Sequence, residues 1–396
     1  MEIALIKSSK IRIRSSLLLI LFSYSFFAFS KSGTDPVKDS LDIMIGQMIM
    51  VGIGDFNLVD SNEPIFSEIK SGKVGGVVLY EKNILFESPK PELASLVEAL
   101  QKQAETPLFV SIDEEGGWVT RMKTRYGFPK NVSAQYLGDL DNLDSTRFYA
   151  KQTADLLSSF GINMNYAPVV DVNLNPRNPV IGRIERSYSE DYQEVIKHAG
   201  IVIEELRKKD VIPVLKHFPG HGSSRRDTHL GLTDVTETWQ MEEVYPYSAL
   251  IDSGEVSAVM TAHIVNKTLD ETKNPATLSK SVVTDLLRGF LQFEGVIISD
   301  DMQMGAIDNE YGLREAIKLS LLAGVDILMF ANNVSDENRV SATTIHAIIK
   351  DLIFEKIIDT DRIRSSYNRI MKLKGEIGLQ EEGYYRTLKT KLRNYN

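Results

Sequence analysis

Eight short apolar runs, each separated from the next by a helical pattern, constrain the fold of this chain most strongly. The runs span residues 48–53, 74–79, 108–112, 164–170, 211–215, 257–260, 295–298 and 326–330. Most are continuously apolar, which is typical of parallel strands that are buried on both faces. Amphipathic stretches between and after them predict helices over residues 92–105, 145–160, 191–209, 241–253, 280–293, 313–323, 338–354 and 360–374. This order predicts an α/β fold.

Two α/β architectures fit eight such strands, a (β/α)₈ barrel and a doubly wound open sheet. Polar residues at the ends of the runs separate them: Asp113–Gly117, Asp171 and Asn173, Lys216 and His217, Thr261 and His263, Ser299–Asp301, and Asn332 and Asn333. In a barrel the C-terminal ends of all strands meet at one mouth, whereas an open sheet spreads them along an edge. We therefore predict a single TIM-type barrel with its site at that mouth.

The N-terminal 30 residues predict a secretory signal peptide. Four basic residues precede an apolar run at 17–29, and the small residues Ala28 and Ser30 follow a pattern acceptable for cleavage. The run is short for a membrane span, although an uncleaved anchor is the alternative. We expect a catalytic domain over residues 31–376, a charged C-terminal tail over 377–396, and an exported protein in the periplasm or outside the cell.

Composition limits the partners of the chain. It has 396 residues, a net charge of −9 and no cysteine. The absence of cysteine excludes disulfides, and the acidic balance argues against nucleic acid as a partner. We expect a monomer with no stable membrane anchor once the signal peptide is cleaved.

The stretch at 214–229 holds three of the six histidines. It begins as a buried strand and ends as a polar loop, in which Pro219, Gly220 and Gly222 exclude a helix. His217 and His221 therefore do not share a helical face, and a zinc site of the helical kind is not indicated. We expect no metal here.

Asp227 and His229 form the candidate acid/base pair. In extended backbone, side chains two residues apart point the same way. The carboxylate would then hold one imidazole nitrogen while the other faces a substrate, which is the arrangement of a histidine acid/base. A loop histidine bonded to a neighbouring residue is the structural alternative.

A second candidate is the pair of acids that ends the seventh run. A carboxylate at Asp300 suits attack on a sugar carbon or stabilisation of positive charge. We interpret Asp301 as a cap of the segment that follows. Charged groups at or just after strand ends are candidates for binding sugar hydroxyls; they are Asp113, Arg121, Arg186, Lys216 and His217. Trp118 and Tyr188 are candidates for stacking on a sugar face.

These motifs together resemble family 3 glycoside hydrolases of the β-N-acetylhexosaminidase type. The resemblance is carried by Lys216-His-Phe-Pro-Gly-His-Gly222, Asp227-Thr-His229, Asp113-Glu-Glu-Gly-Gly117, Arg186-Ser-Tyr188 and Gly295-Val-Ile-Ile-Ser-Asp-Asp301. The pieces run in the family's order and cover roughly residues 41–333. Trp118 is a departure, since an arginine usually stands there.

The resemblance implies a (β/α)₈ barrel that removes terminal β-linked N-acetylglucosamine with retention of configuration and without metal or cofactor. It implies that Asp300 is the nucleophile that forms a glycosyl-enzyme intermediate. It also implies that His229 is the acid/base on a flexible loop and that Asp227 is its partner. The residues that would hold the terminal sugar are Asp113, Arg121, Arg186, Lys216 and His217.

Three alternatives stay open. A β-glycoside phosphorylase is one, because a histidine would not repel phosphate as a glutamate would. A β-glucosidase of the same family usually carries a second α/β domain, for which few residues remain after the eighth run. A non-catalytic sugar-binding barrel would not need Asp300, Asp227 and His229 together. The expected function is therefore exo-acting hydrolysis of cell-wall fragments or chitin oligosaccharides.

Overall fold

The computed structural model describes residues 41–56, 63–380, 383–393 and 395, so the predicted signal peptide lies outside the described residues. Eight parallel strands form one sheet in the order β10-β1-β2-β3-β4-β5-β7-β9. They are β1 (Ile49–Gly52), β2 (Gly76–Leu79), β3 (Phe109–Ile112), β4 (Met164–Asn165), β5 (Ile212–Phe218), β7 (Ala258–Thr261), β9 (Val296–Ile298) and β10 (Leu328–Phe330). Each overlaps one of the eight predicted runs, so the predicted strands are confirmed.

The sheet closes on itself between β9 and the segment that leads into β10. Ile298 forms a parallel bridge with Ile327. The amide of Ser299 donates to the Ile327 carbonyl at 2.9 Å, and the Ile327 amide donates to the Ile297 carbonyl at 3.0 Å. Since every other strand pairs with two neighbours, this seam completes a TIM-type barrel, as the sequence predicts.

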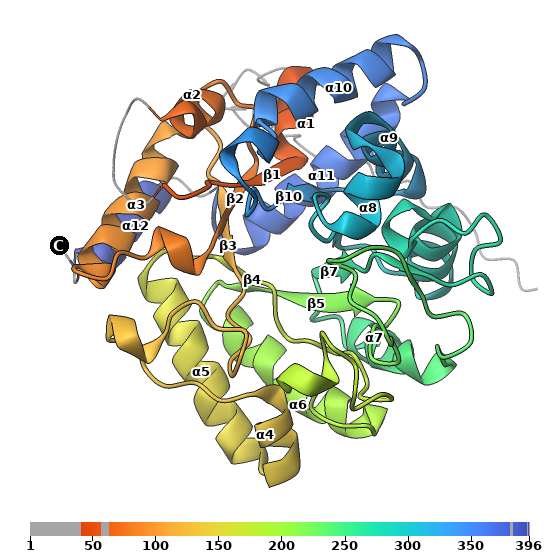
Figure 1. Ribbon diagram of the computed structural model, residues 1–396. Coiled ribbons are helices and arrows are strands. Elements are labelled where there is room, and N and C mark those ends of the chain that lie inside the picture. Colours follow the sequence, from red (N-terminus) through yellow and green to blue (C-terminus); the bar gives the residue numbers. More distant parts are fainter. Residues whose placement is uncertain (1–40, 57–62, 381–382, 394, 396) are drawn as a thin grey trace, which may run out of the picture. The chain divides into compact units, whose positions relative to one another are not determined.

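The predicted helices surround the strands (Figure 1). They are α3 (Pro89–Gln103), α5 (Leu143–Ser159), α6 (Tyr192–Arg207), α7 (Tyr245–Asp252), η6 (Ser281–Phe290), α9 (Leu313–Ala323), α10 (Ala342–Phe354) and α11 (Thr360–Glu376). The hydrogen bonding of η6 is of the π type. Among the described residues, no helix is both long and apolar enough to cross a membrane.

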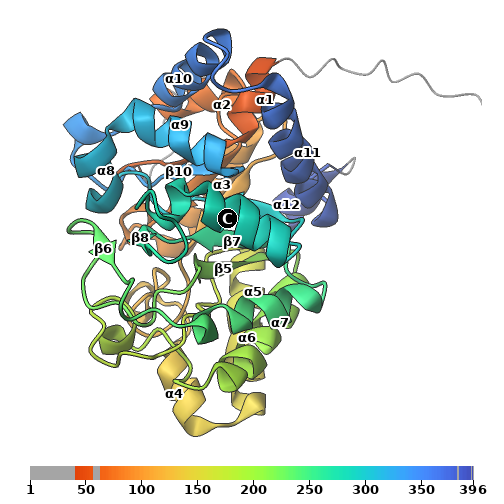
Figure 2. The same cartoon turned by 90° about the vertical axis from the view of Figure 1, so that its right-hand side faces the viewer.

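Five helices are absent from the prediction: α1 (Leu41–Gln47), α2 (Pro64–Lys70), α4 (Ala134–Leu140), α8 (Gly305–Tyr311) and α12 (Tyr384–Leu392). Four of them have only seven residues, too few to show a helical period. Helix α12 lies in the C-terminal tail, where Leu388 and Leu392 are buried. Figure 2 shows α11 and α12 on the opposite side of the strands from the small sheet of β6 (Thr233–Asp234) and β8 (Ile264–Val265).

Two strands differ from their predicted bounds. Strand β4 ends at Asn165 rather than near residue 170. Pro168 lacks the N–H that a continued ladder needs, and pairing resumes only in a bridge between Val169 and Lys216. Strand β5 runs on to Phe218 with a register shift between Leu215 and Phe218. Lys216 and His217 therefore lie within this strand rather than after it.

Asp326 stabilises the seam at which the barrel closes. Its side chain is fully buried and accepts the Ile297 amide of β9 at 2.9 Å. It also pairs with Arg369 of α11 at 2.8 Å and with Arg288 of η6. One carboxylate thus ties the last strands of the barrel to two outer helices.

We expect Asp326→Ala to lower the free energy of unfolding by about 3–5 kcal/mol, because it leaves the Ile297 amide without its acceptor and partly buried arginines without their counter-charge. Denaturant unfolding of the variant beside Asp351→Ala measures this. Asp351 is an exposed acid on α10, and its loss should have little effect. A variant of Asp326 as stable as the parent chain would show that the seam does not depend on this carboxylate.

Candidate active site

A cavity of about 380 Å³ opens where the strands end. Its lining includes residues from almost every strand end: Tyr80, Asp113, Arg121, Tyr166, Arg186, Lys216, His217, His229, Met260, Asp300, Asp301, Gln303, Met329, Ala331 and Asn333. Seven of the eight predicted site residues are among them; Asp227 contacts one of these, His229. The structure thus brings together residues that are up to 187 positions apart in sequence, counted from Asp113 to Asp300.

Lys216 is the centre of a buried charged cluster. Its side chain is 2% exposed, and its Nζ lies 2.7 Å from Asp113 Oδ1 and 2.6 Å from Glu115 Oε1. A lysine ammonium has three donors, so a third direction is left for the cavity. Burying this cation is tolerable because two carboxylates of the β3 end face it.

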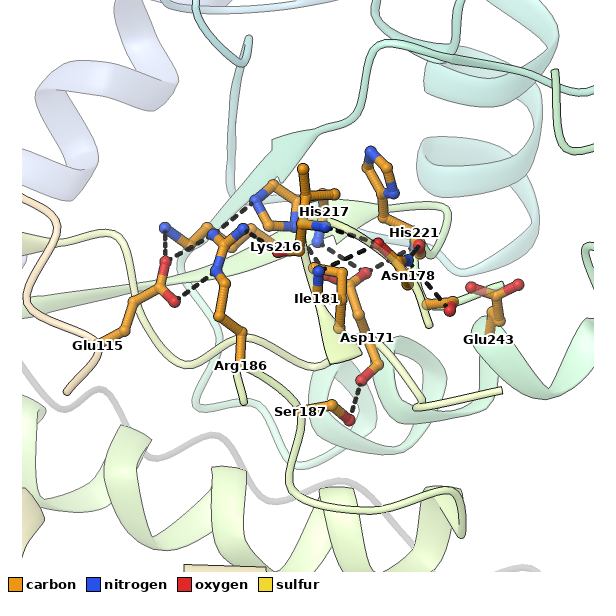
Figure 3. Close-up of polar contacts among 12 residues, drawn as sticks. Glu115, Asp171, Asn178, Ile181, Arg186, Ser187, Lys216, His217, His221 and Glu243 are labelled. Atoms are coloured by element: carbon orange, nitrogen blue, oxygen red, sulfur yellow. Dashed lines mark hydrogen bonds and ion pairs between the residues drawn. The ribbon is translucent and has the colours of Figure 1, made fainter. Parts of the chain in front are cut away.

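Arg186 completes the cluster from the other side (Figure 3). It donates to both oxygens of Glu115, at 2.8 and 2.7 Å, and to the carbonyl of Val180 at 2.8 Å. Such a bidentate pair fixes the plane of the guanidinium. Arg121 lies 3.2 Å from Asp113.

The cluster keeps its carboxylates ionised. Burial raises the pKa of Asp113, but Lys216 and Arg121 outweigh burial and hold that pKa well below its ordinary value. Burial also raises the pKa of Glu115, but Arg186 and Lys216 outweigh burial and lower that pKa. The result is a rigid set of charged donors and acceptors at the mouth, suited to the hydroxyls of a sugar.

His217 is oriented by a fully buried aspartate. Its Nδ1 lies 2.7 Å from Asp171 Oδ2, and its Nε2 lies 3.3 Å from Arg186. Since a guanidinium can only donate, Nε2 accepts and Nδ1 carries the proton. Asp171 also accepts the amide of His221 at 2.7 Å, so one carboxylate sets both the ring and the following turn (Figure 3).

Asp300 and Asp301 meet different environments. Burial raises the pKa of Asp300, but His263 and His217 outweigh burial, and its pKa is lowered. Burial dominates at Asp301 and raises its pKa to about 6. Two adjacent acids whose pKa values are pushed apart take different roles.

The contacts of the two acids agree with that division. Asp300 Oδ1 accepts the Asp301 amide at 2.8 Å, while its Oδ2 has no hydrogen-bond donor among the described residues. Asp301 Oδ1 accepts the amides of Gln303 and Ala331, at 3.1 and 2.9 Å, so it shapes the turn and links β9 to β10. Asp300 is the ionised carboxylate whose free oxygen is available to the cavity.

Asp227 and His229 pair on a loop. The Nδ1 of His229 lies 2.7 Å from Asp227 Oδ1, which also accepts the His229 amide at 2.8 Å. The backbone is not extended as expected, because Asp227 O accepts the Leu230 amide in a turn. This turn, rather than extended backbone, brings the side chains of Asp227 and His229 together. The His229 side chain is 63% exposed, which leaves Nε2 open at the cavity.

Both ends of this loop are anchored. Gly222 approaches Val172 so closely that an added Cβ would lie 1.7 Å from the Val172 carbonyl oxygen. Downstream, Thr233 and Asp234 of β6 pair with Ile264 and Val265 of β8. Between these anchors Thr228 is buried and its carbonyl accepts the Ala306 amide at 3.2 Å, so the loop is also held next to His229.

The two aromatic candidates lie differently from one another. Trp118 is 69% exposed and outside the lining of the cavity, and Tyr188 is buried and stacked on His198 at 5.3 Å. Glu115, Asp171 and Glu243 belong to the site's support but were not singled out from the sequence. Glu115 and Asp171 stand at strand ends, which was the available signal; Glu243 showed none.

An ionised carboxylate, a histidine held by an aspartate and a cluster of charges suited to sugar hydroxyls lie together at the mouth of a (β/α)₈ barrel, as expected for the class of glycoside hydrolases. The chain belongs to glycosyl hydrolase family 3, whose N-terminal domain matches residues 40–373.

Relatives with known names agree with this family. Beta-hexosaminidase A of Pseudoalteromonas piscicida is 32% identical over 346 residues, which are 79% of this chain and 55% of that protein. Beta-hexosaminidase LpqI of Mycobacterium tuberculosis is 33% identical over 296 residues, 72% of each chain. The solved structure of a family 3 beta-N-acetylglucosaminidase from Paenibacillus sp. str. FPU-7 has a TM-score of 0.78 at 30% identity, over 87% of this chain and 64% of that one. The chain thus spans just over half of the first relative.

Glu243 contacts the first part of the loop that carries His229, and its buried carboxyl group can be tested. It is fully buried, and its Oε2 lies 3.3 Å from the Ser223 amide. Burial raises its pKa from 4.5 to about 8. Between these values the unfolded state has released the proton and the folded state has not, so the free energy of unfolding falls as pH rises.

We expect Glu243→Gln, which cannot ionise, to become more stable than the parent chain as pH rises from about 5 to 8. The difference should grow by at most ~1.4 kcal/mol per pH unit. Denaturant unfolding at pH 5, 6.5 and 8 measures it, with Glu242→Gln as the matched control. Parallel pH curves for the parent chain and Glu243→Gln would contradict a buried neutral acid.

Proposed function

We propose that this chain is an exo-acting, retaining β-N-acetylhexosaminidase that releases terminal β-linked N-acetylglucosamine from cell-wall fragments or chitin oligosaccharides. The observation that carries the proposal is that Asp300, with its lowered pKa and free oxygen, and His229, paired with Asp227, line one cavity. Names of relatives that include beta-hexosaminidase and beta-N-acetylglucosaminidase support the choice of sugar.

In the proposed first step, Asp300 Oδ2 attacks the anomeric carbon. His229 Nε2 gives its proton to the departing glycosidic oxygen, so the aglycone leaves as a neutral alcohol. The sugar is then bonded to Asp300. In the second step His229 takes a proton from water, whose oxygen attacks the same carbon and releases the carboxylate. Two displacements restore the starting configuration.

The surrounding groups serve this chemistry. Asp227 stabilises the imidazolium of His229 as it forms and holds the ring by Nδ1. A cation at His229 also lies beside the carboxylate of Asp300 without repelling it. The buried cluster of Lys216, Arg186 and Asp113 binds the hydroxyls of the terminal sugar. Because that cluster is buried at the mouth, a chain end rather than an internal sugar reaches it.

We expect Asp300→Ala to abolish hydrolysis of a chromogenic β-N-acetylglucosaminide, because no glycosyl-enzyme can form. His229→Ala should lose little on a substrate with a good leaving group and about 10²–10⁴-fold on a poor one, which needs the proton. Steady-state rates on both substrates, with and without phosphate, measure this.

The matched control is Glu310→Ala, an exposed acid on α8 that should keep full activity. Sugar phosphate formed in the presence of phosphate would favour the phosphorylase alternative. An active Asp300→Ala would sink the nucleophile assignment. A folded parent chain that binds N-acetylglucosamine without cleaving any glycoside would point to the binding-protein alternative.

We also propose that residues 1–30 direct export and are removed, so that the enzyme meets glycans outside the inner membrane. The basic start and apolar run at 17–29 support this. Intact-mass analysis of the chain expressed in a bacterial host should show the periplasmic or secreted form starting at residue 31. A cytoplasmic protein that retains its N-terminus would contradict export.

A further inference from the structure

A buried histidine outside the catalytic cavity lacks a partner on one ring nitrogen. His198 of α6 is fully buried, and its ring stacks on Tyr188 with an interplanar angle of 7°. Its Nδ1 lies 2.7 Å from the Thr146 hydroxyl, whereas its Nε2 is buried without a hydrogen-bond partner. An unsatisfied buried polar atom costs roughly 1–3 kcal/mol, so its retention calls for an explanation.

The Nδ1 of His198 and the Thr146 hydroxyl form a hydrogen bond in which either atom can be the donor, and the contact from that hydroxyl to the Asn142 carbonyl is 3.5 Å long. When Nδ1 is the donor, Nε2 offers a lone pair to a ligand.

Two carboxylates lie close to the His198 imidazole. Glu194 stands one turn before His198 on α6, and Asp141 ends α4 with a φ of 46°. One ligand atom from each of the three residues lies within 4.8 Å of the other two. Lys197 binds Glu194 Oε1 at 2.6 Å, but Glu194 Oε2 is buried without a partner. An imidazole nitrogen and a carboxylate oxygen, both buried without a partner, are thus available to a cation at this place.

We propose that Asp141, Glu194 and His198 form a binding site for a divalent transition-metal ion of the zinc class. One imidazole and two carboxylates, with water in the fourth position, are a ligand set that zinc accepts. Bonds of about 2.1 Å would place tetrahedral ligands roughly 3.4 Å apart. The contact of Nδ1 with Thr146 is the outer hydrogen bond that holds a metal-binding histidine.

The site would connect two helices beside the sugar-binding arginine. Helix α4 also contacts the segment between Arg186 and Tyr188, since a Cβ on Gly138 would lie 1.7 Å from the Tyr188 carbonyl oxygen. Bound metal would therefore join α4 to α6 across this segment, which carries Arg186. The role is to hold the fold, and the ion takes no part in bond breaking.

Titration calorimetry of the chelator-treated full chain with ZnCl₂ tests the proposal. Asp141→Asn and Glu194→Gln remove one ligand charge each; asparagine suits the left-handed φ of position 141, so the fold should persist. We expect each to weaken zinc binding at least tenfold, a loss typical even of outer-sphere changes. Zinc should raise the melting temperature of the parent chain and much less that of the variants.

Two controls make the result specific. Asp139→Asn removes an equal charge from the exposed face of α4 and should bind zinc like the parent chain. His229→Ala removes a catalytic histidine that zinc could also occupy, and it should keep the site at α4 and α6. The proposal is overturned if Asp141→Asn and Glu194→Gln bind zinc as tightly as the parent chain. Zinc binding that disappears in His229→Ala alone would overturn it as well.

Discussion

The ammonium of Lys216 between Asp113 and Glu115 is the interaction on which the mouth of this barrel depends. A buried cation is stable only when its counter-charges are fixed around it. The two carboxylates are fixed because they follow directly on β3, and Lys216 is fixed because it lies within β5. Strand β4 lies between these two strands in the sheet. The barrel therefore fixes the positions of the cluster residues. The carboxylates of Glu115 and Asp113 then bind Arg186 and Arg121, which lie on loops.

Two further sets of hydrogen bonds connect this cluster to the loop that carries His229. Arg186 contacts the Nε2 of His217, whose Nδ1 is held by Asp171. Asp171 also binds the amide of His221, where the loop that carries His229 begins. A chain of charge-assisted hydrogen bonds thus leads from the buried cluster around Lys216 to the start of the loop that carries His229. On this loop the His229 side chain stays exposed, whereas the neighbouring Thr228 is buried and accepts the Ala306 amide at 3.2 Å.

Much of this could be predicted from the sequence, because strand and barrel signals are local. The continuous apolar runs predicted all eight strands, and seven of the predicted site residues, from strand ends and loops, line one cavity. Which side chains pair with one another depends on the folded chain and cannot be read from neighbouring residues in the sequence. Glu115 and Glu114 are adjacent acids, yet only Glu115 faces Arg186, whereas Glu114 accepts the amides of Arg121 and Met122. The short helices α4 and α8 and the turn at Asp227 likewise depend on contacts that no period in the sequence reveals.

A similar difference between the surroundings of adjacent acids explains why one of two neighbouring aspartates is suited to act as a nucleophile. Asp300 and Asp301 have equal intrinsic acidity, and both are withdrawn from water at the end of β9. Asp301 receives amides from its own turn and from Ala331, but burial still dominates and raises its pKa to about 6. Asp300 has His263 and His217 nearby, and these two rings outweigh burial and lower its pKa. The His263 ring is held by Thr277 and by the carbonyl of Asp301, so the acid that shapes the turn also helps to position the histidine that keeps its neighbour ionised.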